Sequence, residues 1–201
     1  MNSKLNVLVT LIFCWQYSYS QDTTHTDVTN VTKVTLFNPG ISYEMRIAKF
    51  QTLYVQLFMG VSGKFEYSSS LGNTSTFYFD PAVTLQYRYY YNGKRRMARD
   101  KRTEMNSMNY VTLALGTVFS KMPFSKFRYI EKNRRAINSF RLAWGFQRNY
   151  QRRFSLDLNL GLGYYFTKVT TQLSPQILTE TAGIISPTGQ LNIGLWLNKR
   201  K

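Results

Sequence analysis

The sequence predicts an all-β fold: a single antiparallel, up-and-down transmembrane β-barrel of about eight strands, preceded by a cleaved signal peptide. Three observations support this prediction. Apolar and polar residues alternate with a period of two along much of the chain, the apolar face carries no charge, and the N-terminus resembles an export signal. No stretch approaches the roughly 18 consecutive apolar residues of a membrane helix, which excludes a polytopic helical membrane protein.

Residues 1–20 are predicted to be a secretory signal peptide. Lys4 supplies the positive charge, residues 7–15 form a short apolar core, and the small residues Ser18 and Ser20 mark a cleavage site. The segment is followed by polar residues and not by more core. We therefore expect export, with the bacterial outer membrane as the final location.

The exported chain is expected to consist of a polar N-terminal tail, residues 21–30, and one barrel domain, residues 31–201. The single cysteine, Cys14, lies inside the signal peptide, so the exported chain cannot depend on disulfides and its sheet must provide its stability. Acylation of Cys14 as a lipoprotein is a minor alternative, because the bulky Phe13 precedes it.

The clearest strand covers residues 154–166, where every even position is large and apolar and most odd positions are small or polar. The same alternation predicts six further strands, within residues 41–47, 53–67, 77–91, 111–115, 140–146 and 191–197. No segment of helical period competes with them. The architecture expected is an antiparallel meander joined by turns and polar loops.

Alternation alone does not decide which face points inward, because a soluble barrel buries its apolar face and a membrane barrel turns it to lipid. Thirteen residues at about 3.3 Å each, tilted by about 40°, rise roughly 33 Å, enough to cross an apolar band of about 25 Å. The polar face is rich in glycine and alanine, which suits a narrow interior. Aromatic residues gather near strand ends, as in interfacial girdles. The apolar face is therefore predicted to face lipid.

The polar face carries four acidic and four basic side chains, which we predict to form a structural charge network in the barrel lumen. They are Glu44, Arg46, Lys64, Glu66, Asp80, Arg88, Arg141 and Asp157. A balanced set of charges favours a lumen closed by ion pairs, whereas a pore would be expected to show an excess of one sign. A proton or substrate relay through these groups is the alternative.

The formal charge of +16 is concentrated in loops and ends, above all in residues 94–104 and 121–135. Anionic lipid headgroups and the phosphates of lipopolysaccharide are the partners that such patches favour, and solvated loops without a partner are the alternative. Nucleic acid is disfavoured by the export signal. The candidate lipid contacts are Lys94, Arg95, Arg96, Arg99, Lys126, Arg128, Lys132, Arg134 and Arg135.

The sequence contains no recognisable catalytic, cofactor or metal motif. His25 is the only histidine, it precedes every predicted strand, and the exported chain has no cysteine that could bind a metal. A lipid hydrolase or acyltransferase would need a base beside a serine, and His25 is the one candidate. We expect no cofactor, no metal and no enzymatic activity.

An eighth strand is required, because single-chain bacterial barrels have an even number of strands. Residues 31–37, turning at Asn38-Pro39-Gly40, are preferred, because Asn-Pro-Gly is a turn signal. This choice puts the loops after residues 67, 120 and 166 on the outside, opposite the C-terminus. Residues 169–178 are the alternative. With the preferred eighth strand, residues 168–188 are expected to form a long loop.

Three segments resemble the small outer-membrane β-barrel proteins of Bacteroidetes-type bacteria. They are residues 36–44 (LFNPGISYE), residues 86–92 (QYRYYYN) followed by a basic turn and NYV at 109–111, and residues 189–195 (GQLNIGL). The resemblance implies an outer-membrane location and a small barrel, without an assigned activity and without functional residues to transfer.

Together these features favour a non-enzymatic barrel with a closed, charge-paired polar lumen that acts as a structural or interaction protein at the cell surface; its protein partner is not indicated. The first alternative is a narrow channel or a surface receptor whose specificity lies in its loops. The second is a lipid-modifying enzyme of the outer membrane.

Overall fold

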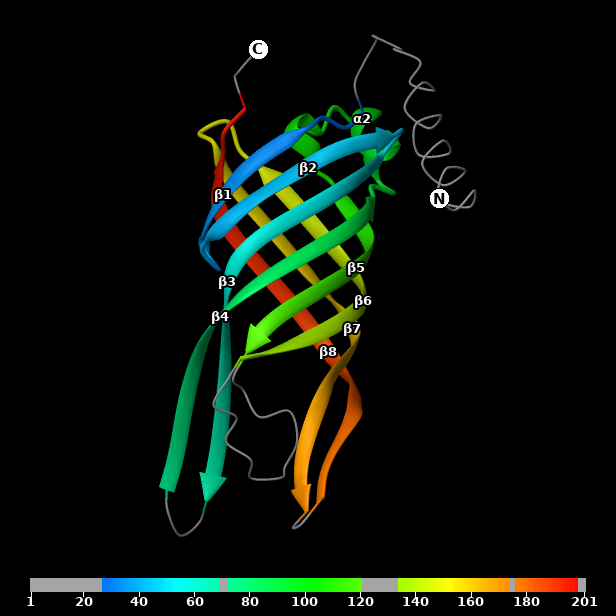
Figure 1. The fold of residues 1–201 in the computed structure, drawn as a ribbon. Coiled ribbons are helices and arrows are strands. Elements are labelled where there is room, and N and C mark those ends of the chain that lie inside the picture. Colours follow the sequence, from blue (N-terminus) through cyan, green and yellow to red (C-terminus); the bar gives the residue numbers. More distant parts are fainter. Residues whose placement is uncertain (1–26, 69–71, 121–133, 174–175, 199–201) are drawn as a thin grey trace, which may run out of the picture.

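The protein is an all-β molecule in which eight antiparallel strands, joined in chain order, are hydrogen-bonded into a closed ring (Figure 1). The computed structural model describes residues 27–68, 72–120, 134–173 and 176–198, and side chains for 27–61, 78–120, 134–169 and 180–198. The predicted signal peptide lies outside the described residues, as does most of the expected N-terminal tail.

Each strand pairs with its neighbours in the chain, and β8 closes the ring by pairing with β1. The strands are β1 (Val31–Phe37), β2 (Gly40–Ala48), β3 (Gln51–Ser68), β4 (Gly72–Tyr89), β5 (Asn109–Ser120), β6 (Arg135–Asn149), β7 (Phe154–Leu173) and β8 (Gln176–Trp196). Two short helices, α2 (Gly93–Met97) and η2 (Glu104–Asn106), lie between β4 and β5. In the part of the chain that is described, no helix is long and apolar enough to cross a bilayer.

The preferred eighth strand is confirmed, because β1 lies between β2 and β8 and turns at Asn38. The long loop predicted over residues 168–188 is wrong, because β7 and β8 continue as one hairpin through much of that region. Proline is disfavoured in a central strand, but Pro187 lies on a part of β8 whose ladder partner is β7 alone. An edge position of this kind tolerates a proline in a strand.

The two ends of the ring differ in their connections (Figure 1). The short links after β2 and β6 and the helical link after β4 lie at one end, where β1 begins and β8 ends; this will be called the helix end. The β3–β4 and β7–β8 hairpins extend past the ring at the opposite end, which will be called the hairpin end. This arrangement matches the predicted grouping of turns and loops.

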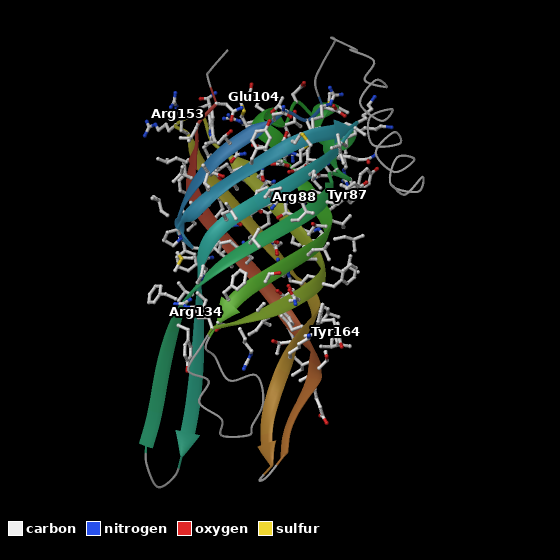
Figure 2. The ribbon with its side chains drawn as sticks, viewed as in Figure 1. Tyr87, Arg88, Glu104, Arg134, Arg153 and Tyr164 are labelled. Carbon is white, nitrogen blue, oxygen red and sulfur yellow. The ribbon has the colours of Figure 1, made fainter. Side chains whose placement is uncertain are left out.

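Burial in the ring is the reverse of that in a soluble protein. Leu142 and Leu162 are 58% and 60% exposed, whereas Arg88 and Glu44 are completely buried. Among the described residues, polar and charged side chains outnumber apolar ones in the buried set. Adjacent residues take opposite faces, as Tyr87 and Arg88 do on β4 (Figure 2). The predicted inward direction of the polar face is therefore observed.

Exposed aromatic side chains gather toward both ends of the outer face, with aliphatic side chains such as Leu57, Leu113 and Leu142 between them. Tyr87 and Tyr164 represent the two groups (Figure 2). Toward the helix end lie Tyr43, Tyr87, Tyr89, Tyr91, Trp144, Tyr150 and Phe154, and toward the hairpin end Phe37, Phe79, Phe119, Phe140 and Tyr164.

A small apolar cluster closes the interior at the helix end. Val28, Phe50, Tyr90, Met108 and Tyr110 are each at most 6% exposed and pack together. Because Val28 precedes β1, the residues just before the first strand fold against this end of the ring. The cluster separates the polar interior from the helical link.

Gly194 is expected to be essential for closure of the ring. An added Cβ would meet the carbonyl oxygen of Val34 on β1, which is backbone and cannot move away easily. We expect Gly194→Ala to lower the free energy of unfolding by about 1–3 kcal/mol, measured by urea unfolding. Gly189→Ala, on the same strand, is the control, because its Cβ would meet the flexible end of Leu160. An equal loss in both variants would contradict this explanation.

Candidate functional site

Arg88 is at the centre of the ring interior. Its Nη1 donates hydrogen bonds to Asp157 Oδ2 and to Gln147 Oε1, both at 2.9 Å. Nε and Nη2 donate to Gln86 Oε1 at 2.9 and 2.8 Å. The guanidinium thereby joins β4 to β6 and β7 across the interior, with a carboxylate directly opposite its charge.

Two tyrosine rings enclose the same guanidinium. Its Cζ lies 3.8 Å from the ring centroid of Tyr54 on β3 and 4.4 Å from that of Tyr110 on β5. Tyr110 also donates a hydrogen bond from its hydroxyl to Asp157 Oδ1 at 2.5 Å. A desolvated cation–π contact contributes about 2 kcal/mol, so the rings stabilise a charge that has left water.

Lys33 and Glu44 complete the charge balance beside Arg88. Lys33 Nζ lies 3.8 Å from Glu44 Oε2 and 4.0 Å from Asp157 Oδ2, and it donates to Gln147 Oε1 at 2.5 Å. Glu44 accepts hydrogen bonds from Tyr90, Thr52 and Gln147. Two acids and two bases are thus held together with neither carboxylate left without donors.

These side chains will be called the interior cluster: Lys33, Glu44, Tyr54, Arg88, Tyr90, Tyr110, Gln147 and Asp157. They come from β1 to β7, apart from Tyr90, which directly follows β4. All are at most 2% exposed, and they fill the cross-section of the ring toward the helix end. A buried pair is costly unless its remaining lone pairs and protons are satisfied, and here several neutral donors and acceptors satisfy them.

A second polar layer lies on the hairpin side of the interior cluster. Gln190 Nε2 donates to Gln56 Oε1 at 2.8 Å, and Gln56 Nε2 donates to Asn192 Oδ1 at 3.3 Å. These amides link β3 and β8 across the interior. They form a polar layer between the interior cluster and the part of the interior nearer the hairpin end.

On the hairpin side of this polar layer, the interior contains a cavity of about 630 Å³. Thr84, Ser139 and Arg141 line one part of it, and the aromatic rings of Phe58 and Tyr165 belong to the same lining. Arg141 donates from Nη2 to Thr84 Oγ1 at 2.8 Å. A cavity of this size is within the range used by small-molecule sites.

The structure distributes the predicted lumen charges over more than one group. Arg88 pairs with Asp157, and Glu44 is in the same cluster but has Lys33 as its nearest base. Arg141 lies in the cavity.

The remaining predicted charges lie elsewhere. Arg46 pairs with Asp27 at 3.2 Å near the helix end. Asp80 pairs with Arg134 at 3.0 Å near the hairpin end. The side chains of Lys64 and Glu66 lie outside the described set.

Sequence reasoning missed several members of the interior cluster. Lys33 lies on an inward position of β1. This strand has only seven residues, so its alternation of apolar and polar residues is too short to predict which side chains point inward. Tyr54 and Tyr110 are flanked by residues assigned to the outer face, and strand parity could have placed both inside. Gln147 lies one residue beyond the predicted strand 140–146, whereas β6 continues to Asn149.

The candidate lipid contacts also differ from one another. Lys94, Arg95 and Arg99 are exposed in or just after α2, whereas Arg96 donates to the carbonyl oxygen of Arg102. Arg134 bonds Asp80.

Arg135 begins β6 and is half-buried. Lys126, Arg128 and Lys132 lie outside the described residues. Within the described ranges, no three acidic, histidine or cysteine side chains are arranged to hold a metal ion.

We expect Arg88→Met to destabilise the ring by about 3–5 kcal/mol, because Lys33 alone would remain to balance the two buried carboxylates of Glu44 and Asp157. Arg88→Met combined with Asp157→Asn should recover part of that loss, because Lys33 and Glu44 then remain as a balanced pair and no buried charge is left uncompensated. Urea unfolding of both variants measures the difference. The matched control is Arg95→Met in exposed α2, which should change stability by less than about 0.5 kcal/mol. Equal effects of Arg88→Met and Arg95→Met would refute the role of the interior cluster.

No family model, no curated protein and no solved structure matches this chain. A role can therefore be argued only from its own ring, interior cluster and cavity.

Proposed function

We propose that the protein is a small β-barrel of the bacterial outer membrane, with a closed and charge-paired interior, acting as a structural or interaction protein at the cell surface. One observation carries this proposal: the ring buries charged residues such as Arg88 and Asp157 and exposes a belt of leucines such as Leu142. In water this distribution would expose a large apolar patch and bury costly charges. In a bilayer it is the favourable one, because lipid solvates the belt.

The aromatic groups support the same placement. Tyrosine and tryptophan rings suit the interface between lipid and water, and the exposed aromatic side chains lie toward both ends of the aliphatic belt. The Trp144 indole donates to the Tyr91 hydroxyl at 2.7 Å, so these polar edges are bonded to each other on the outer face.

The exposed bases in and just after α2 suit a contact with anionic headgroups at the helix end. Lys94, Arg95 and Arg99 lie close to the exposed tyrosines of β4 in the chain, at the level where headgroups would be expected. In this proposal the helix end faces the periplasm and the long hairpins face outward, where lipopolysaccharide phosphates are the corresponding anions.

Leu142→Arg tests the membrane placement. In lipid we expect a loss of about 2–4 kcal/mol, because a charge at the centre of the belt must leave water. Met97→Arg, on exposed α2 outside the belt, is the control and should be nearly neutral. The measurement is urea unfolding after refolding into phosphatidylcholine vesicles. If the outer face lies in water, Leu142→Arg costs no more than about 0.5 kcal/mol, and the proposal fails.

The closed interior predicts no ion conduction. In planar bilayers the folded protein should give no stepwise current, because the interior cluster leaves its side chains at most 2% exposed. Folding can be checked independently by the mobility of unboiled samples on gels. Steps in current whose ion selectivity changes in Arg88→Gln, while stability stays unchanged, would favour a narrow channel.

A further inference from the structure

The ring wall is interrupted on one side, between β3 and β8. The β2–β3 ladder reaches Gly40 and Phe58, and the β1–β8 ladder reaches Phe37 and Ile193. Farther toward the hairpin end, the described ladders join β3 to β4 and β8 to β7, and none joins β3 to β8. Figure 1 shows the β1–β2 turn ending short of these two hairpins, which stand apart beyond it.

The β1–β2 turn forms the edge of this interruption that faces the helix end. The interruption will be called the side opening. Asn38 Nδ2 donates to the carbonyl oxygen of Leu191 on β8 at 3.0 Å. The N–H of Met59 on β3 donates to the carbonyl oxygen of Pro39 at 2.8 Å. The turn is therefore attached to both flanking strands, and the side opening is a defined feature of the wall.

The interior cavity extends to the side opening. Its lining includes Asn38 of the turn, Val61 of β3 and Leu191 of β8, and it also includes Arg141 on β6. Outside this opening the surface is apolar, because Leu36 and Phe37 are 66% and 52% exposed. The same cavity is thus lined both by Phe37 of the apolar outer face and by Arg141 inside the ring.

Arg141 has no acidic partner among the described side chains. Its Nε is buried without a hydrogen-bond partner, and so are Asn159 Nδ2 and Gln190 Oε1. Leaving such groups unsatisfied is costly, and more so for a charged group. An anion bonded to the guanidinium would remove the largest of these costs.

The interior is shaped around this arginine. A Cβ added at Gly116 would lie 3.3 Å from Arg141 Nη2, and one added at Gly163 would lie 2.9 Å from its Cγ. Glycine at these two positions, on the strands that flank β6, therefore leaves room for the Arg141 side chain.

We propose that the cavity binds a single-chain anionic amphiphile, with its carboxylate or phosphate head on Arg141 and its chain passing through the side opening. The charge selects an anionic head, and the apolar surface outside the opening selects a hydrocarbon chain. Entry from the bilayer rests on the membrane placement proposed above, whereas the contact with Arg141 does not.

The test uses dodecanoate carrying a photoreactive diazirine on its chain, with the corresponding alcohol as the neutral probe. The protein is folded in phosphatidylcholine vesicles, irradiated and mapped by peptide mass spectrometry. We expect cavity-lining segments around Phe58 and Gln190 to be labelled about tenfold more by the acid than by the alcohol. The same probe with a phosphate head shows which anionic head is preferred.

Two variants remove the site in different ways. Arg141→Met removes the charge, and Gly60→Leu fills the cavity while the Arg141 side chain stays. Gly60 tolerates a side chain, because its Cβ would lie 3.5 Å from Phe58 Cε2 and 3.6 Å from the carbonyl oxygen of Asp80. Both variants should lose interior labelling by the acid about tenfold. Arg152→Gln, at an exposed position near the helix end, should keep it.

Labelling confined to the outer apolar face, or interior labelling that is equal for acid and alcohol or unchanged in Arg141→Met, would overturn the proposal. Gel mobility of unboiled samples confirms that each variant is folded. Repeating the experiment in detergent separates the two proposals. If the protein tolerates Leu142→Arg, the membrane placement is rejected. If labelling does not depend on Arg141 either in vesicles or in detergent, the binding site alone is rejected.

Discussion

The buried contact between Arg88 and Asp157 is the interaction on which the rest of the interior depends. It joins β4 to β7 across the ring, and the aromatic rings of Tyr54 and Tyr110 hold the guanidinium in place. Removal of either charge would leave the other buried without its closest partner. The surrounding amides and hydroxyls therefore have to match both charges, which explains why nearly every strand contributes a polar side chain at this level.

The same constraint explains the outer face. Hydrogen-bonded polar groups occupy most inward positions of the ring, and alternation directs the large apolar side chains of the same strands outward. The only apolar cluster among the described residues that is shielded from solvent lies at the helix end, around Tyr90 and Met108. Such a molecule needs an apolar surrounding for its belt of leucines, and this need underlies the proposed outer-membrane location.

The interior has two halves with different properties. Toward the helix end, the interior cluster is neutral, fully bonded and closed. Toward the hairpin end, Arg141 lies in a cavity with unpaired polar atoms and a side opening under the short β1–β2 hairpin. The closed half suits a structural role, and the open half suits recognition of a ligand. The proposed closed interior and the proposed binding site therefore lie in different halves of the same ring.

The sequence alone determined the class of fold, the position of β1 and the inward direction of Glu44, Arg88 and Asp157. Period-two alternation is a local property, so it can be read without knowing the partner strands. Only the tertiary structure decided that Glu44 meets Lys33, that Asp80 meets Arg134, and that Arg141 lies in a cavity without an acid among the described side chains. Those outcomes depend on how the staggered strands close into a ring, because closure determines which inward positions share a level, and no spacing within one strand contains that information.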